Sequence, residues 1–504
     1  MTRYHSALRI ILFIFTFHFS TTVSSQSTLP PLTDSIESKI LNETRGIQVK
    51  MPNDYKPGSG QKYEVVYILD GEWYYDLVPF TYNFAESAKY LPKSIFVLIR
   101  NRYLNGLNLR GRDFSPTKVP QDPLSGGADQ FYNFVTKEVV PYIESKYPTN
   151  GQRTLVGSSF SGLFSVYAFL KNPAFFQSFV ASDPNINWDN SYVTKIAGKM
   201  LDSLSQSAGT LYIGGLTRTY RDMGIQGFDS VLQVRAPESL HWKCVAYPDE
   251  SHYSVQLKAF YDAFRFSHRG YALTPPEFHP MAGLINNEKP FTVYFLNDNP
   301  GVRFTSDGSN PDTTSKMMVR DESITIKIPA ELRVKTFGNR QSYSKEWTST
   351  FSRGKIDPVK SNKKVVLNYS LYNGKWDSIP SSTASLKAGQ SGIADSLFKF
   401  SSLQSKVPFL LVIEGLIDVP KDAEYVFYAN GYDATQLSLG DKDLFKIDNG
   451  KVKPSQSYVV SLLKGKYPMR LVILKKTNDP QPHFTIFQSR PDSEKWWENR
   501  WINF

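Results

Sequence analysis

The stretch Arg153-Thr-Leu-Val-Gly-Ser-Ser-Phe-Ser-Gly162 decides the fold that we expect for the first half of the chain. Its apolar pair Leu155-Val156 predicts the end of a buried strand, small residues follow, and residues 163–170 are typical of a helix. A strand, a sharp turn with a serine at its tip and a helix form a nucleophile elbow, in which Ser159 is the candidate nucleophile. The same pattern also fits an ordinary serine-rich turn between a strand and a helix.

Apolar runs alternate with helical patterns on both sides of this stretch, which predicts a mostly parallel, doubly wound sheet. The expected strands cover residues 45–51, 64–69, 95–99, 155–156, 175–182, 210–213 and 242–247, and a helical pattern covers 130–146. Sites in such sheets form at the carboxyl ends of the strands. Asp70-Gly71-Glu72, Ser159, Asp183 and His252 each follow an expected strand, so we expect them at one edge.

His252 is the candidate base, because a serine hydroxyl is a weak nucleophile and needs an adjacent imidazole to take its proton. It lies in the polar loop Asp249-Glu-Ser-His-Tyr-Ser254, after the last expected strand and before an aromatic-rich helix. The order of serine before histidine matches that of α/β-hydrolases. The alternative is a histidine in a surface loop with no catalytic role.

Composition limits the function classes. The 504 residues are too many for one core, and the formal charge of +11 comes from scattered Lys and Arg with no basic run, which argues against nucleic acid as a partner. Residues 1–25 have the pattern of a secretory signal peptide, so we expect a secreted or periplasmic protein without a membrane span. Cys244 is the only cysteine, and neither a Cys/His metal cluster nor a phosphate-binding glycine loop is found.

Several further motifs, in a fixed order, make residues 45–268 similar to the esterase D family of α/β-hydrolases. They are Tyr67–Glu72, Arg112-Asp113, Ser125–Asp129, Glu138–Glu144, the stretch 153–162, Asp183-Pro184 with Trp188, and Tyr247–His252. The resemblance implies an α/β-hydrolase domain over 27–270, with Ser159 as nucleophile, His252 as base and no cofactor. It also implies an oxyanion hole built from the backbone N–H of Phe160 and one from Gly71-Glu72.

The third member of the triad stays open. The family often has a carboxylate just after the strand that is 210–213 here, but this chain has none in the first positions, and Asp222 is the next candidate. Asp183 is the alternative and Glu250 a third, and a Ser–His pair without an acid is also possible. Arg112, with Asp113, and Trp188 are candidate substrate-binding residues, although Arg112-Asp113 fits a structural ion pair equally well.

The second half of the chain is expected to be all β. A proline-rich seam at 273–280 predicts a linker, and short strands over 271–353 predict a small β-sandwich, whose residues 302–315 resemble the C-terminal sandwich of chitobiases and hexosaminidases. Residues 357–504 resemble a protective-antigen-type β-sandwich. The aspartate pair that holds calcium in sugar-binding members is not matched at 429–434. Trp496, Trp497 and Trp501 fit either a sugar platform or a core position.

The expected function is a secreted serine esterase acting through an acyl-enzyme. The β modules favour acetyl or hydroxycinnamoyl esters on carbohydrate as substrates. A siderophore esterase of the enterobactin type is the enzyme alternative, and a catalytically inactive glycan-binding relative is the alternative without catalysis. The sequence leaves the oligomeric state open.

Overall fold

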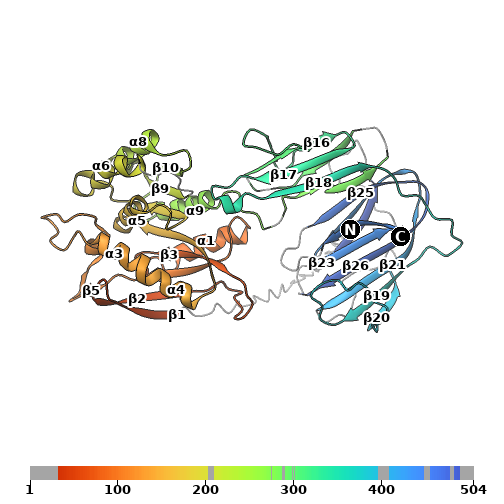
Figure 1. Cartoon of the computed structure of the whole chain (residues 1–504), viewed down its shortest axis with the longest axis horizontal. Helices are drawn as coiled ribbons and strands as arrows, with labels where there is room; N and C mark the ends of the chain where they lie inside the picture. Colours follow the sequence, from red (N-terminus) through yellow and green to blue (C-terminus); the bar gives the residue numbers. More distant parts are fainter. Residues whose placement is uncertain are drawn as a thin grey trace, which may run out of the picture.

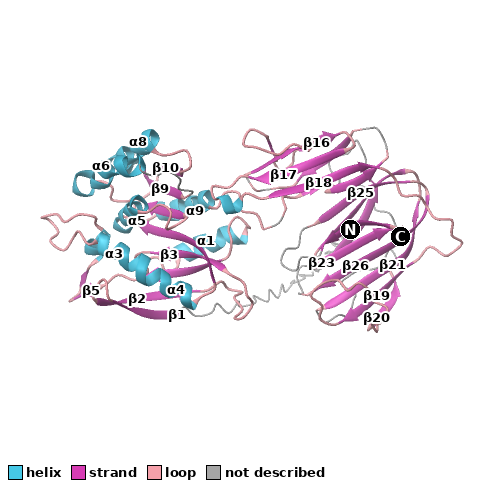
Figure 2. Ribbon diagram, in the orientation of Figure 1, coloured by secondary structure: helices cyan, strands magenta, loops and turns pink. Residues whose placement is uncertain are grey.

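The computed structural model describes residues 32–202, 209–273, 275–286, 290–297, 299, 301–394, 408–447, 455–476 and 482–488. The α/β half lies on the left of Figure 1 and the β half on the right. Figure 2 shows the helices gathered in the α/β half. The signal-peptide prediction for 1–25 and the prediction for Trp496, Trp497 and Trp501 lie outside the described residues.

An eight-stranded sheet organises the first half, in the order β1-β2-β4-β3-β7-β8-β9-β10. Strands β3, β4, β7, β8, β9 and β10 run parallel, and β1 and β2 pair antiparallel at one edge. The bounds are β1 Leu32–Ser38, β2 Glu43–Lys50, β3 Tyr63–Ile68, β4 Ser94–Ile99, β7 Thr149–Ser158, β8 Ser178–Ser182, β9 Thr210–Leu216 and β10 His241–Tyr247. A small hairpin, β5 Tyr103–Leu104 and β6 Leu107–Asn108, follows β4. The expected parallel sheet is therefore present.

Helices cover both faces of this sheet. Helices α1 and α9 pack on one face over Val66, Ile68 and Val180, and the other helices of the larger core cluster lie on the opposite face. The bounds are α1 Leu77–Ser87, α2 Arg110–Phe114, α3 Ala128–Phe134, the π-helical turn η1 Val135–Val139, α4 Val140–Lys146, α5 Phe160–Lys171, α6 Trp188–Asp202, α7 Thr217–Asp222, α8 Ile225–Arg235 and α9 Val255–Ser267. Helix α5 directly follows β7, and its residues 161–170 are buried in the core. Because strand and helix are both held in this way, the turn between them has little freedom to move.

The β half differs from the expected pair of separate sandwiches. Strand β12 (Ala282–Ile285) pairs in parallel with β18 on one side and β25 on the other, so one eight-stranded sheet, β15-β14-β17-β18-β12-β25-β22-β27, runs through both expected modules. A three-stranded sheet, β11-β13-β16, and a six-stranded sheet, β20-β19-β21-β26-β23-β24, complete the half. The expected boundary near 353–357 falls in the segment between β18 and β19, and the eight-stranded sheet has strands from both sides of it.

The strands of the β half have these bounds: β11 Phe278–His279, β13 Phe291–Phe295, β14 Val302–Thr305, β15 Lys316–Met317, β16 Ser323–Ile326, β17 Ala330–Thr336, β18 Glu346–Arg353, β19 Leu367–Asn373, β20 Gln390–Ile393, β21 Phe409–Val419, β22 Ala423–Asn430, β23 Ala434–Leu439, β24 Lys442–Ile447, β25 Gln456–Leu462, β26 Gly465–Lys475 and β27 His483–Gln488. The short 3-10 turn η2 (Gln341–Tyr343) lies between β17 and β18. Buried residues alternate with less buried, charged residues along β17, as expected for a strand with one face on a core.

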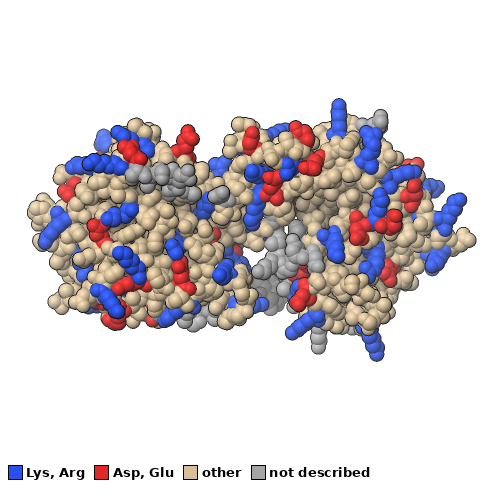
Figure 3. Space-filling view, in the orientation of Figure 1, with Lys and Arg blue, Asp and Glu red and all other residues tan. Residues whose placement is uncertain are grey.

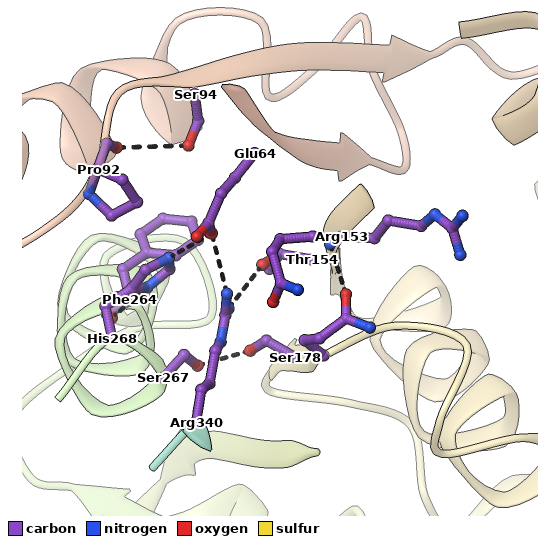
Figure 4. Close-up of polar contacts among 12 residues, drawn as sticks. Glu64, Pro92, Ser94, Arg153, Thr154, Ser178, Phe264, Ser267, His268 and Arg340 are labelled. Carbon is purple, nitrogen blue, oxygen red and sulfur yellow. Dashed lines mark hydrogen bonds and ion pairs between the residues drawn. The ribbon is translucent and has the colours of Figure 1, made fainter. Parts of the chain in front are cut away.

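The two halves meet at the amino ends of the parallel strands. Arg340, just before η2, donates from Nη1 to Glu64 at 2.9 Å and from Nη2 to Thr154 at 3.2 Å (Figure 4). Tyr343 also donates to Glu64, at 2.6 Å. The side chains of Arg340 and Glu64 are only 2% and 6% exposed. The β half is thus anchored at the end of the sheet opposite to the expected site.

Charged side chains are spread over the surface. Lys and Arg are interspersed with Asp and Glu on the face shown in Figure 3, in agreement with the scattered charges of the sequence. No helix of the described ranges is both long and apolar enough to cross a membrane.

Candidate active site

Ser159 lies at the tip of a sharp turn between β7 and α5. Its backbone has φ 58° and ψ −119°, a region that residues other than glycine rarely adopt and that is found at functional turns. Gly157 is needed beside it, because a Cβ there would lie 2.1 Å from the Ser161 carbonyl oxygen. The Ser159 N–H donates to Ser182 O at 2.9 Å and ties the turn to β8. The geometry is that of a nucleophile elbow.

Ser161 occupies the position where the usual motif has glycine. Its hydroxyl donates to the Ser158 carbonyl at 2.9 Å and accepts from the Ser158 N–H at 2.8 Å. Ser158 and Ser161 are both buried, so these two bonds satisfy the backbone N–H and carbonyl of Ser158 away from water. The departure from the motif therefore closes the elbow rather than disrupting it.

The carboxylate beside His252 belongs to Asp183. His252 Nδ1 and Asp183 Oδ2 are 2.6 Å apart, with the imidazole 37% exposed and the carboxylate fully buried. Asp183 follows β8 and His252 follows β10, so the contact spans the end of β9. The other Asp183 oxygen accepts hydrogen bonds from the Thr219 hydroxyl and, at 3.4 Å, from the Leu216 N–H. Because these donors are neutral, the charge of Asp183 remains available to hold and stabilise an imidazolium at His252.

Asp222, the acid ranked first from the sequence, is not at this position. Its side chain is 53% exposed and pairs with its neighbour Arg221 at 3.3 Å, because α7 carries it to the surface beyond the end of β9. Glu250 is also directed elsewhere: it pairs with Lys258 and accepts from Ser254.

Two residues that support Asp183 were not found from the sequence. Thr219 donates its hydroxyl to Asp183 from the first turn of α7. Gly215 leaves the room that Asp183 occupies, because a Cβ there would lie 3.2 Å from Asp183 Oδ1 and 2.5 Å from Ile225. The Gly214-Gly215 pair at a strand end was the available signal for a close approach of this kind.

The expected oxyanion hole needs one N–H from the Gly71-Glu72 turn, and the structure favours that of Glu72 over that of Gly71. The Gly71 N–H donates to the Ile99 carbonyl at 2.9 Å and is not available to a ligand. Gly71 is required for a different reason, since a Cβ there would lie 2.8 Å from the backbone of Leu98. The N–H groups of Glu72 and Phe160 have no acceptor among the described residues. They remain the candidate donors, one after β3 and one at the N-terminus of α5.

Arg112 belongs to a structural ion-pair network. It donates to Asp113 at 2.7 Å and to Glu43 at 2.7 Å and 3.1 Å, and Arg45, buried below it, donates to Asp113 at 2.6 Å. Each of its three guanidinium nitrogens is thus paired with a carboxylate, which favours the structural alternative over substrate binding.

Arg110 is the basic residue near the elbow, and the sequence did not single it out. It forms a two-point ion pair with buried Asp70 (Nε–Oδ1 3.0 Å, Nη2–Oδ2 2.8 Å). Its guanidinium lies 4.9 Å from the ring centre of Trp73 and 5.5 Å from that of Phe160. The Arg110 guanidinium and the two aromatic rings therefore lie together next to the candidate oxyanion donors.

Trp188 also packs next to the elbow, against Phe160. Its ring packs edge-on against Phe160 with centres 5.1 Å apart, and its Nε1–H donates to Thr117. Asp189, Asn190 and Ser191 follow with positive φ, so a left-handed turn begins α6. Trp73, Phe160 and Trp188 are thus linked through Arg110 and through Phe160, the residue after Ser159, and we refer to these three side chains as the aromatic rim.

Comparisons with known proteins agree with this geometry. Residues 38–208 match a family model described as a putative esterase. The ferri-bacillibactin esterase BesA of Bacillus subtilis is 29% identical over 175 residues, which are 32% of this chain and 60% of BesA. The siderophore triacetylfusarinine C esterase of Aspergillus fumigatus is 27% identical over 179 residues, 32% of this chain and 59% of that enzyme. The chain thus spans about 60% of the length of these relatives.

Among solved structures, an IroE-like serine hydrolase from Shewanella oneidensis is 28% identical, with 48% of this chain and 82% of that chain covered and a TM-score of 0.44. Taken together, the family model and the curated relatives support an esterase-like α/β-hydrolase family for the first half of the chain.

Proposed function

We propose that the protein is a serine carboxylic-ester hydrolase whose triad is Ser159, His252 and Asp183. The observation that carries the proposal is the 2.6 Å contact between His252 and the fully buried Asp183 carboxylate, at the same strand ends as the strained Ser159 turn. A surface histidine has no need of a buried carboxylate, whereas a general base does, because the carboxylate fixes its tautomer and orientation.

In the first half-reaction, His252 takes the proton of the Ser159 hydroxyl through Nε2, and the oxygen attacks the ester carbonyl. The negative charge on the carbonyl oxygen is stabilised by the N–H groups of Phe160 and Glu72. His252 then protonates the leaving alcohol, the ester bond breaks and Ser159 carries the acyl group. Water hydrolyses this acyl-enzyme with His252 again as the base.

For the substrate, we propose an ester whose acyl part carries an aromatic group, of the catecholate siderophore type. The rim of Trp73, Phe160 and Trp188, with Arg110 stacked against two of the rings, suits flat aromatic groups that carry negative charge. Two relatives named as siderophore esterases support the same choice. A hydroxycinnamoyl ester of a carbohydrate is the second candidate, because it offers the same aromatic ring and suits an enzyme with an attached β half.

The test has two parts. First, the protein and Ser159→Ala are treated with a fluorophosphonate and assayed with a short-chain p-nitrophenyl ester; labelling and turnover are expected only with Ser159 present. Second, hydrolysis of a tris-catechol lactone is compared with hydrolysis of a feruloylated oligosaccharide. Faster hydrolysis of the lactone supports the siderophore proposal, and the reverse supports the second candidate. Absence of both labelling and turnover in the folded protein would contradict the esterase proposal and favour the inactive glycan-binding alternative.

A further inference from the structure

Asn185 contacts the candidate nucleophile directly. The Ser159 hydroxyl donates to Asn185 Oδ1 at 2.9 Å, and no hydrogen bond joins it to His252 among the described side chains. The backbone holds Asn185 in place from both sides: its N–H donates to Ser159 O at 3.3 Å, and its carbonyl accepts from the Trp188 N–H at 3.1 Å. The half-buried amide therefore faces the reacting oxygen from a fixed position.

The strand order shows on which side of Ser159 this amide lies. Strand β7, which ends at the elbow, has β3 on one side and β8 on the other. The candidate oxyanion donor Glu72 follows β3, whereas Asn185 follows β8, two residues after Asp183. Asn185 therefore lies on the side of the His252–Asp183 pair and away from the Glu72 donor. His252 acts on this side, first as the acid that protonates the leaving alcohol and then as the base that takes a proton from the incoming water.

We propose that Asn185 is a catalytic residue of deacylation, an inference that rests on the proposed esterase function. In the free enzyme it holds the Ser159 hydroxyl. In the acyl-enzyme that oxygen has lost its proton, so Asn185 Oδ1 has no donor there and accepts a hydrogen bond from the hydrolytic water.

The step balances without a further reactant. The water donates one proton to His252 Nε2 and keeps the other in its hydrogen bond to Asn185, while its oxygen attacks the acyl carbonyl. The tetrahedral intermediate collapses, the bond from the acyl carbon to Ser159 Oγ breaks, and Oγ takes the proton back from His252. A carboxylic acid leaves, and the Ser159 hydroxyl returns to Asn185.

This role makes acylation and deacylation respond differently to one substitution. Asn185→Ala removes the acceptor that competes with His252 for the serine proton, so acylation is not slowed. It also removes one of the two groups that orient the water, so we expect deacylation to slow roughly 10- to 100-fold. The measured signature is a lower kcat and a lower KM, a kcat/KM within about threefold of wild type, and an accumulating acyl-enzyme.

The experiment uses p-nitrophenyl acetate with the full-length protein. Burst kinetics give the acylation rate, intact-mass spectrometry detects the acyl-enzyme, and its decay gives the deacylation rate. Asn187→Ala is the matched control, because Asn187 is exposed and its amide donates to the Asp222 carbonyl at 3.1 Å; both rates are expected to stay within about twofold. Should Asn185→Ala not fold, Asn185→Thr is expected to give the same pattern, since its side chain is too short to reach the same water position.

The outcomes separate this inference from the proposed function. Fluorophosphonate labelling of Ser159 in the wild type tests the nucleophile independently of Asn185. With labelling intact, slow decay of the acyl-enzyme in the Asn185 variant supports the inference. With labelling intact, equal losses of kcat and kcat/KM and no acyl-enzyme would overturn it and leave the esterase proposal standing. Absence of labelling in the wild type would overturn both.

Discussion

Two pairs of histidine and carboxylate lie at opposite ends of the same parallel sheet. At the carboxyl ends, His252 contacts Asp183 at 2.6 Å; at the amino ends, His268 contacts Glu64 at 3.3 Å. Both carboxylates are buried, but the His252 side chain is 37% exposed, whereas that of His268 is completely buried. The same two side-chain types therefore occur once beside an open turn and once within an interface.

The surroundings of the carboxylates account for the difference. Glu64 is paired with Arg340 of the β half; burial acts to raise its pKa, but Arg340 and hydrogen bonds from His268 and Tyr343 outweigh burial and lower the pKa to about 2. Burial and the nearby Arg340 lower the pKa of His268 below its usual value. Arg340 thus balances the negative charge of Glu64, and the lowered pKa disfavours a second positive charge at His268.

Asp183 has no such cation: apart from His252, its described side-chain and backbone partners are the neutral Thr219 hydroxyl and the Leu216 N–H. Among these partners, only the His252 side chain can carry a positive charge beside Asp183. This difference favours the proposal that His252 is the base, because among the described residues no cation other than His252 contacts the Asp183 carboxylate. At Glu64 the permanent cation Arg340 pairs with the carboxylate instead.

The largest expected effect comes from exchanging each histidine for glutamine. We expect His252→Gln to lower hydrolysis of a p-nitrophenyl ester by about 10³-fold or more, with the free energy of unfolding changed by less than about 0.5 kcal/mol. His268→Gln is expected to do the reverse: activity within about threefold, and a loss of about 1–3 kcal/mol in stability. Steady-state rates and urea unfolding of both variants measure this, and equal effects at the two sites would contradict the comparison.

Removal of the third charge gives the next largest effect. Arg340→Met leaves Glu64 buried and uncompensated, and we expect it to cost about 3–5 kcal/mol in the free energy of unfolding. The double variant Glu64→Gln/Arg340→Met should recover most of this loss, because no buried charge remains.

A matched control for Arg340→Met is Arg235→Met, which breaks a pair whose two side chains are each 52% exposed. This control should change stability by less than about 1 kcal/mol. A similar loss in Arg340→Met and Arg235→Met, measured by urea unfolding, would show that the interface ion pair is not an anchor.

The smallest effect concerns pH. Because the folded protein lowers the pKa of His268 below the ordinary 6.5, the folded state binds fewer protons than the unfolded state in acid. The stability that His268 contributes is therefore complete above about pH 6.5 and is lost as pH falls toward the folded-state pKa, by up to about 1.4 kcal/mol per pH unit. Melting curves from pH 7.5 to 5 should show a shallower loss in His268→Gln than in wild type, and identical slopes would contradict this.

The sequence predicted features that depend on neighbouring residues in the chain. The elbow could be predicted because strand, Ser159 and helix are contiguous, and the strand-end position of His252 followed from the same alternation. The predicted strands 95–99 and 242–247 coincide with β4 and β10 to within one residue. Each of these depends on local periodicity and turn chemistry.

The features that were missed depend on contacts between distant residues. That His252 contacts Asp183, given only as the alternative to Asp222, depends on the crossing from β10 over β9 and on the space left at Gly215, neither of which is visible in local periodicity. Arg110 and Arg112 are two residues apart, and only the packing of α2 shows which one lies near the elbow. The four-residue strand β12 has little signal of its own, although it joins the two expected modules into one sheet.

The central claim is that Asp183 completes the triad, and one matched pair of variants tests it most directly. Asp183→Asn and Asp222→Asn each remove one negative charge with almost no change in shape, and kcat/KM for the same p-nitrophenyl ester is measured for both. The account predicts a loss of about 10³- to 10⁴-fold for Asp183→Asn and a change within about twofold for Asp222→Asn. Full activity in Asp183→Asn, or a large loss in Asp222→Asn with folding intact, would contradict it.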